Sequence, residues 1–298
     1  MQKLRYYVKV LYNRMDFWLS YLINLPITGG FTMTKNTKRI IVFLLVTFGL
    51  MYVSHGLIAV LLETTSIEWD NFPLNMLGII GGGAPAFAAL FVVYKMYNEK
   101  EKKAYWDSVY LFRVPWYWWG VALFSPLIIG VIANVVYHGG WWYPELKWAD
   151  IIAFPLMFAV MTFAGGIEEL GWRGILQDML TKKVNLIVTG VVIGVLWGLW
   201  HGPLFLIDVF AHYDYAFSIY MIFAVIYSLL LTLVVYKTKS VMLAVMLHAS
   251  TNAFGNLGFG IPMEVHGGLI VLLVLLFIVF AAVLYFVENN NKSIKNSN

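Results

Sequence analysis

The stretch Gly267–Val287, GGLIVLLVLLFIVFAAVLYFV, contains no charged residue. A helix needs about 20 consecutive apolar residues to cross the hydrocarbon core of a bilayer, so this stretch predicts a transmembrane helix. The whole chain agrees with it, since 61% of its 298 residues are hydrophobic and 12% are charged. Soluble domains are roughly 45–50% apolar and about 25% charged. The composition therefore excludes a water-soluble globular fold.

Similar apolar segments precede this one and predict an all-α, polytopic membrane protein of about eight transmembrane helices. We find no internal repeat and no long linker, so residues 37–298 are expected to form a single transmembrane domain. Gly81–Gly83 and Pro85 weaken the second helix. The seven segments are Ile40–Leu62, Leu74–Tyr94, Trp116–Tyr137, Ala149–Gly166, Val184–His201, Ala216–Val235 and Val241–Gly260.

Residues 1–36 differ from the rest of the chain. Apolar residues recur there at steps of four and three, and basic residues lie off that stripe. This pattern predicts an amphipathic helix on the inner leaflet of the membrane. The alternative is a helix packed against the bundle. The stripe consists of Leu4, Val8, Leu11, Met15, Trp18 and Leu22.

The basic residues orient the chain. If the N-terminus is cytoplasmic, Lys147 is the only one of 20 Lys and Arg residues on the far side of the membrane. This bias predicts an integral, multi-pass protein with both termini in the cytoplasm. The formal charge of +4 is scattered between apolar runs, so the expected partner is the lipid bilayer and not nucleic acid. With no cysteine, disulfides, thiolate metal sites and a cysteine nucleophile are excluded.

The first polar cluster, Gly165-Gly166-Ile167-Glu168-Glu169-Leu170-Gly171-Trp172-Arg173, lies at the inner end of the fourth predicted helix. Ionisable groups inside a bilayer cost about 2.5–3.5 kcal/mol each, so they rarely occur without a partner or a task. Residues four apart share a helix face, whereas neighbours point about 100° apart. Glu169 is therefore expected to pair with Arg173, which leaves Glu168 as a general base or ligand. The alternative is a capped helix end with interfacial charges.

Two histidines lie in other apolar segments. His201 comes four residues after Trp197 and just before a helix-weakening Gly-Pro pair. His248 and Asn252 are four apart, so both point the same way, and Asn252 can hold the imidazole or donate to an oxyanion. Singly, such histidines are commonly satisfied residues of a helix bundle. Together with Glu168 they supply a carboxylate and two imidazoles, which is what water activation in a membrane requires.

These motifs resemble a family of intramembrane proteases, the CAAX prenyl endopeptidase and bacteriocin-processing family (CPBP, also called Abi). Its signature is Glu-Glu-x-x-x-Arg, then Phe-x-x-x-His, then His-x-x-x-Asn. This chain has Glu168-Glu169-x-x-x-Arg173, a variant Trp197-x-x-x-His201, and His248-x-x-x-Asn252, in that order. The resemblance covers a protease-like core of about residues 149–260.

The resemblance implies an endopeptidase that cleaves prenylated CAAX or other small peptide substrates near the membrane surface. It implies no organic cofactor. Zinc is possible, because a catalytic zinc usually has three protein ligands, and Glu168, His201 and His248 would supply them. A metal-free, glutamate-dependent site is the preferred interpretation. The implied roles are water activation by Glu168 with His201, oxyanion stabilisation by His248 and Asn252, and positioning by Glu169 and Arg173.

Two other functions compete with this one. In an ion-coupled transporter or proton-relay protein, Glu168 and the histidines would line an ion path. The chain lacks the two-fold internal repeat that many such proteins show. A protease-like scaffold or immunity protein would keep the fold without catalysis, and the intact polar set argues mildly against it.

The depth of the histidines adds a geometric expectation. At about 1.5 Å per residue, His248 lies about 13 Å along its helix from Lys239, but His201 lies roughly 27 Å from Lys183. The fifth helix is therefore expected to be tilted or to begin below the membrane plane, with the site open to the cytoplasm. Basic residues at its rim would favour a C-terminal carboxylate or acidic substrate flanks.

Overall fold

The computed structural model describes residues 33–296, and the regular elements within that range are all helices. The predicted all-α membrane fold is confirmed. In the described range, six helices are long and apolar enough to cross a membrane, and a bent pair brings the number up to seven. The seventh predicted segment, Val241–Gly260, forms a shorter helix followed by a π-helical turn. The predicted amphipathic helix falls almost entirely outside the described residues.

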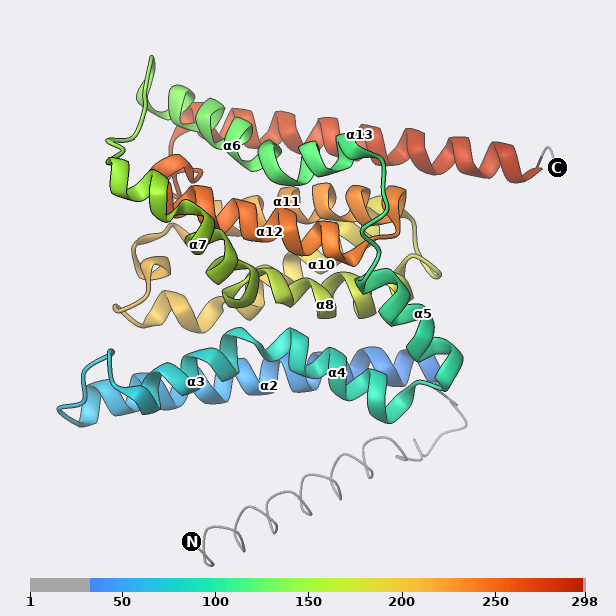
Figure 1. Ribbon diagram of the computed structural model, residues 1–298, viewed down its shortest axis with the longest axis horizontal. Coiled ribbons are helices and arrows are strands. Elements are labelled where there is room, and N and C mark those ends of the chain that lie inside the picture. Colours follow the sequence, from blue (N-terminus) through green and yellow to red (C-terminus); the bar gives the residue numbers. More distant parts are fainter. Residues whose placement is uncertain (1–32, 297–298) are drawn as a thin grey trace, which may run out of the picture.

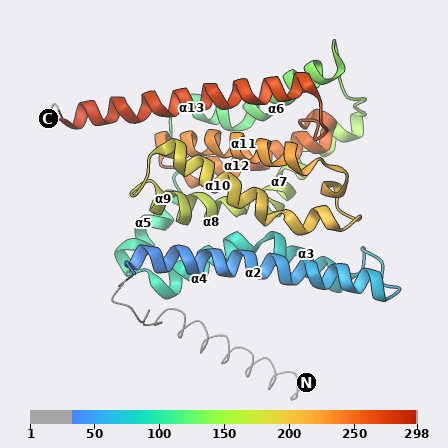
Figure 2. The same cartoon turned by 180° about the vertical axis from the view of Figure 1, so that it is seen from behind.

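The helices lie in three layers, with their long axes roughly parallel (Figures 1 and 2). One outer layer contains α2 (Lys35–Thr64), α3 (Phe72–Gly82) and α4 (Ala84–Met96), and the opposite one contains α6 (Trp116–His138) and α13 (Gly267–Asn296). Between them lie α7 (Trp148–Ala164), α10 (Leu186–Trp200), α11 (Phe217–Thr238) and α12 (Val241–Phe254). The shorter elements are α5 (Glu99–Val109), η1 (Gly166–Glu168), α8 (Glu169–Gly171), η2 (Trp172–Gln177), α9 (Asp178–Leu180), η3 (Gly202–Leu206), η4 (Ala211–Asp214) and η5 (Gly255–Phe259).

The second predicted span is broken where the glycines weaken it. α3 and α4 are separate helices that meet at Gly83 and bend by 58°. Pro85 lies in the first turn of α4, where its missing N–H leaves no helical bond unmade. Gly82 and Gly83, at the break, line the cavity that holds the candidate site.

Helix α5 was not predicted, because its sequence is short and polar and has no apolar run. A capping box starts it: the Asn98 side chain accepts from the Glu101 backbone N–H, and the Glu101 side chain accepts from the Asn98 N–H. Glu101 also accepts from both terminal nitrogens of Arg39, at 2.8 and 2.6 Å. This contact ties α5 to the start of α2.

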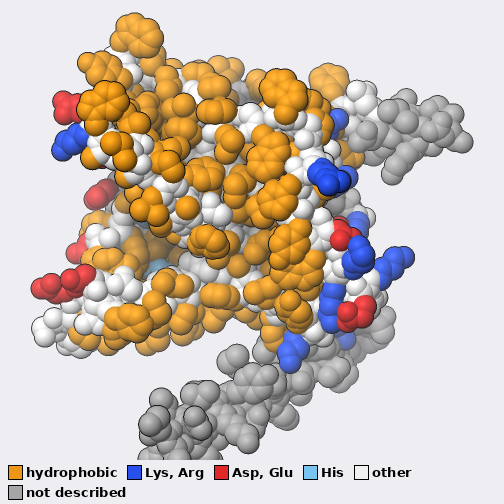
Figure 3. Space-filling view, viewed as in Figure 1, with side chains coloured by type: hydrophobic (Ala, Val, Ile, Leu, Met, Phe, Trp, Pro, Cys, Tyr) orange, Lys and Arg blue, Asp and Glu red, His pale blue; other side chains and the backbone are white. Residues whose placement is uncertain are grey.

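The outer surface is apolar along the helices and charged at their ends. Most of the Lys and Arg side chains seen in Figure 3 gather at one end of the bundle, together with some Asp and Glu, whereas Asp and Glu predominate at the other end. α11 is the most enclosed span, with 72% of its apolar window buried, whereas only 11% of the corresponding window of α13 is buried. Glu168, His201 and His248 are buried within the bundle, whereas α13 is available to face lipid.

Candidate active site

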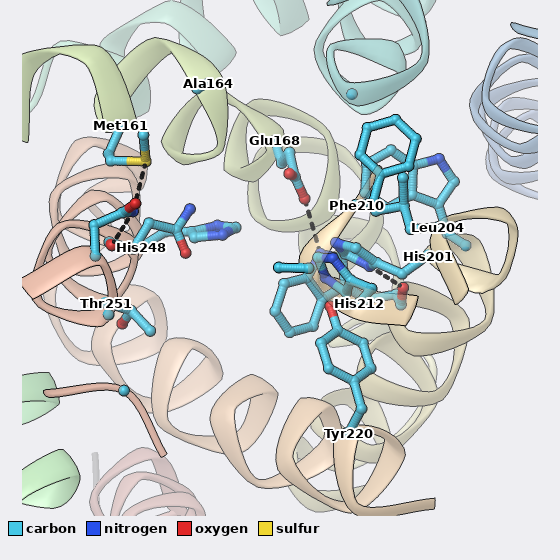
Figure 4. Close-up of a pocket in the computed structure, with 18 of the residues that line it drawn as sticks. Met161, Ala164, Glu168, His201, Leu204, Phe210, His212, Tyr220, His248 and Thr251 are labelled. Atoms are coloured by element: carbon cyan, nitrogen blue, oxygen red, sulfur yellow. Dashed lines mark hydrogen bonds between the residues drawn. The ribbon is translucent and has the colours of Figure 1, made fainter. Parts of the chain in front are cut away.

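A cavity of about 840 Å³ lies in the middle layer, and Glu168, His201, His248 and Asn252 all line it. Figure 4 shows Glu168, His201 and His248 within the same cavity. Of the predicted site residues, Glu169 and Arg173 do not line it. They lie behind the cavity wall, and both are almost completely buried.

Glu168 lies just after a break in the chain direction. α7 ends at Ala164, and Gly165 has φ −146° and ψ −47°, outside the helical range. The short helical elements that follow turn the two adjacent carboxylates in different directions. Glu168 lines the cavity, and its Oε2 accepts a hydrogen bond of 2.8 Å from the indole N–H of Trp197. None of the salt bridges in the described chain involves Glu168.

Glu169 pairs with Arg173 as the i, i+4 spacing indicated. The Arg173 Nε atom donates to Glu169 Oε2 at 2.8 Å. The other carboxylate oxygen, Oε1, lies 2.8 Å from Nδ1 of His248. The terminal nitrogens of Arg173 donate to hydroxyl groups of Ser228 and Thr232 on α11. The Glu169 carboxylate therefore links the first motif to His248 of the third motif. Arg173 is held in turn by its hydrogen bonds to α11.

The imidazole of His248 is oriented by Glu169 and not by Asn252. With Nδ1 turned to Glu169, Nε2 is the ring nitrogen left for the cavity. The Asn252 amide lies beside it, against the Gly165 turn. A Cβ atom at Gly165 would be 2.3 Å from Asn252 Nδ2 and 3.5 Å from His248 Nε2. Both nitrogens therefore lie close to Gly165, at the start of the chain segment that carries Glu168.

His201 is held at the C-terminal end of α10. Its Nδ1 lies 2.8 Å from the backbone oxygen of Trp197, which requires an N–H at that position and leaves Nε2 as the acceptor. The Trp197 ring lies 5.0 Å from the His201 ring and 5.5 Å from the His248 ring, centroid to centroid. Glu168, His201 and His248 therefore all contact Trp197, and the structure brings the three motifs together around this indole.

The residues do not fit the zinc site that the resemblance permitted. Within residues 33–296, no group of three His, Asp or Glu side chains is arranged to hold a metal ion. The Trp197 indole binds Glu168 and packs edge-to-face against both histidine rings, so all three side chains contact the indole that lies among them. We therefore derive no catalytic step through a metal.

Sequence reasoning missed two side chains of the site. Trp197 was treated as a packing variant of a phenylalanine, whereas its N–H holds Glu168. His212, in the η4 turn, lines the cavity and stacks on His201 with ring centroids 5.4 Å apart. The indole N–H itself was the available signal for Trp197, since a buried indole usually finds an acceptor. No sequence signal identified His212.

The position of the cavity along the bundle differs from the expectation. It is lined by Trp69, Phe210, Tyr215 and Met263 from loops at the acidic end, and by no Lys or Arg. The prediction of basic residues at the rim of the site is therefore wrong. The spacing places His201 at the end of its helix far from Lys183. In the structure, Glu168 and His248 contact Trp197 near that same end of α10.

Comparisons with known proteins agree with the motif order. Residues 150–254 match the family model described as type II CAAX prenyl endopeptidase Rce1-like. Over 66 residues the chain is 35% identical to the protein named CAAX prenyl protease 2 from Methanococcus maripaludis. That alignment spans 22% of this chain and 22% of the relative. The resemblance predicted from the motifs is thus confirmed, and the region that carries all three of them is similar to the Rce1-like type II CAAX prenyl endopeptidases.

Proposed function

We propose that this protein is a membrane-embedded endopeptidase in which Glu168 activates the attacking water. The observation that carries the proposal is a buried carboxylate that forms no salt bridge and shares a cavity with two imidazoles and an amide. Such a group is costly inside a membrane bundle unless it has a task. The similarity of residues 150–254 to a peptidase family supports the same reaction.

The proposed reaction begins with a water molecule between Glu168 and His201. Glu168 takes a proton from the water, and Nε2 of His201 accepts a second hydrogen bond that orients it. The water oxygen attacks the peptide carbonyl carbon and forms a tetrahedral intermediate. The C–N bond then breaks, and Glu168 returns its proton to the leaving nitrogen. The products are a carboxylic acid and an amine.

The negative oxygen of the intermediate would be bound by Asn252 and His248, which both line the cavity. Nδ2 of Asn252 is a donor in any protonation state. Nε2 of His248 donates when the ring carries both protons, with Nδ1 held by the Glu169 carboxylate. Glu169 is in turn paired with Arg173. We assign Glu169 and Arg173 as positioning residues because neither lines the cavity.

The substrate proposed from this site is a peptide, with or without a lipid. Much of the cavity wall is apolar, with Met161, Phe163 and Phe223 among its residues. Peptide side chains or a prenyl group would both be desolvated there. The CAAX activity in the relative's name supports a segment near a C-terminus. Cleavage rates of matched farnesylated and unmodified peptides would separate the two classes.

The test compares Glu168→Gln with Glu169→Gln in nanodiscs. Loss of a general base costs about 10²–10⁴-fold in rate, so Glu168→Gln should abolish most cleavage without changing the unfolding temperature. Glu169→Gln leaves Arg173 buried without its charge partner, which costs about 3–5 kcal/mol. It should lower both activity and stability. Wild-type cleavage rates in Glu168→Gln would overturn the proposal.

A further inference from the structure

The catalytic cavity occupies only one half of the bundle. α2, α10 and α12 begin at the basic end, and each contributes lining residues from its second half, such as His55, His201 and Asn252. The remaining wall comes from the loops at the far end, including Trp69 and His212. These loop residues extend the wall of the cavity to that end of the bundle.

A separate cavity of about 350 Å³ lies at the basic end. Arg39, Lys182 and Lys239 line it, and it shares no lining residue with the catalytic cavity. Arg173 lines this second cavity, and its partner Glu169 contacts His248, which lines the catalytic one. In this structure, a substrate that approaches from the basic end therefore meets a different cavity and not the catalytic one.

The loops around the catalytic cavity carry acidic side chains. We call the loops 66–71, 207–216 and 261–264 the mouth. It has five exposed carboxylates, each one or two residues along the sequence from a residue that lines the catalytic cavity. None of the five forms a salt bridge in the described chain. The mouth contains no Lys or Arg. The five residues are Glu68, Asp70, Asp208, Asp214 and Glu264.

Basic loops stay in the cytoplasm in multi-pass proteins. The described loops that hold Lys95–Arg113, Lys182, Lys183, Lys237 and Lys239 all lie at the end opposite the mouth. We propose that the catalytic cavity opens on the extracytoplasmic side and takes peptides with cationic residues next to the scissile bond. The cleavage part rests on the proposed function, whereas the orientation does not. Carboxylates at the entrance would attract and retain such peptides by Coulomb forces.

The orientation can be tested without any activity, because the sequence contains no cysteine. Two single-cysteine variants serve as probes, Asp214→Cys in the mouth and Lys182→Cys at the basic end. Both residues are exposed in the described chain. In intact cells, a membrane-impermeant maleimide should label Asp214→Cys at once and Lys182→Cys only after permeabilisation. The reverse pattern would overturn the proposed orientation, whether or not the protein is a peptidase.

The test of the charge preference uses pairs of peptides that differ only in whether lysines or glutamates flank the scissile bond. In nanodiscs, where both faces are accessible, the lysine peptide should be cleaved with a kcat/KM at least roughly tenfold higher at low salt. Asp70→Asn with Asp214→Asn should shrink that ratio. The matched control removes two acidic charges at the basic end, Glu99→Gln with Asp107→Asn, and should leave the ratio unchanged.

Equal or faster cleavage of the glutamate peptide would refute the preference. So would a kcat/KM ratio that the mouth variants do not change. Absence of all cleavage would contradict the proposed function and leave the labelling result standing.

Discussion

At the scale of residues, Trp197 connects all three motifs. Its N–H binds Glu168, its backbone oxygen holds His201, and its ring packs on His248. The pairing of Glu169 with Arg173 was predictable, because residues four apart meet on a helix. The contact between Glu169 and His248 spans 79 residues and depends on how two helices pack. Spacing within one motif therefore predicted local pairs, and tertiary structure decided the rest.

Replacing Trp197 with phenylalanine keeps a ring between the histidines and removes only the donor to Glu168. A hydrogen bond to a charged group contributes about 1.5–3 kcal/mol, so Trp197→Phe should lower kcat by roughly 10- to 100-fold. KM should change little, whereas the unfolding temperature should fall by several degrees, because the buried carboxylate loses its donor. Trp200→Phe is the control, because its indole N–H binds the backbone oxygen of Thr47 and not a site residue. Full activity in Trp197→Phe would show that this bond does not position Glu168.

His212 makes the protein sensitive to acid. Burial lowers the pKa of His212 from 6.5 to about 4. The folded state therefore binds this proton less readily than the unfolded chain, and the stability that neutral His212 contributes is lost as pH falls from 6.5 toward 4. We expect the unfolding temperature to decline over that window, and less steeply in His212→Gln than in wild type or in the exposed control His138→Gln. Equal slopes for all three proteins would contradict this assignment.

At the scale of elements, the breaks in the helices shape the site. The sequence predicted that Gly81–Gly83 and Pro85 would weaken the second span, and the structure places a 58° bend there. It did not predict how α7 gives way at Gly165 to short helical turns, because hydropathy reports apolar length and not the path of the backbone. It also missed α5, whose capping box was the only local signal. Apolar segments were therefore predictable to within a few residues, and their interruptions only in part.

Two glycines of α6 test how closely the elements pack. A Cβ atom on Gly130 would lie 1.8 Å from the backbone oxygen of Phe259, whereas one on Gly120 has no atom within 4 Å. Gly130→Ala should push η5 away and destabilise the fold by about 1–3 kcal/mol. Gly120→Ala should be neutral or stabilise the fold by up to about 1 kcal/mol, since alanine favours helix. Thermal unfolding in one detergent compares them, and equal effects would contradict the packing described here.

At the scale of the whole molecule, most basic side chains and the cavity lie toward opposite ends of the bundle. Basic side chains gather at one end of the bundle, and the catalytic cavity reaches the other end among acidic loops. The charge bias was readable from the sequence, because alternation of the spans sorts the loops. The side on which the site opens was not readable, since it depends on where three helices cross. The charge at the rim is consequently the opposite of what the sequence led us to expect.

The central claim is that Glu168 activates water for peptide cleavage within the bundle. The most direct measurement incubates nanodisc-embedded protein with a peptide library in ¹⁸O-labelled water and identifies new peptide ends by mass spectrometry. We predict new C-terminal carboxylates that carry one solvent oxygen with wild-type protein, and their loss with folded Glu168→Gln. New ends that form equally with Glu168→Gln, or none that form above that variant with wild type, would contradict the account.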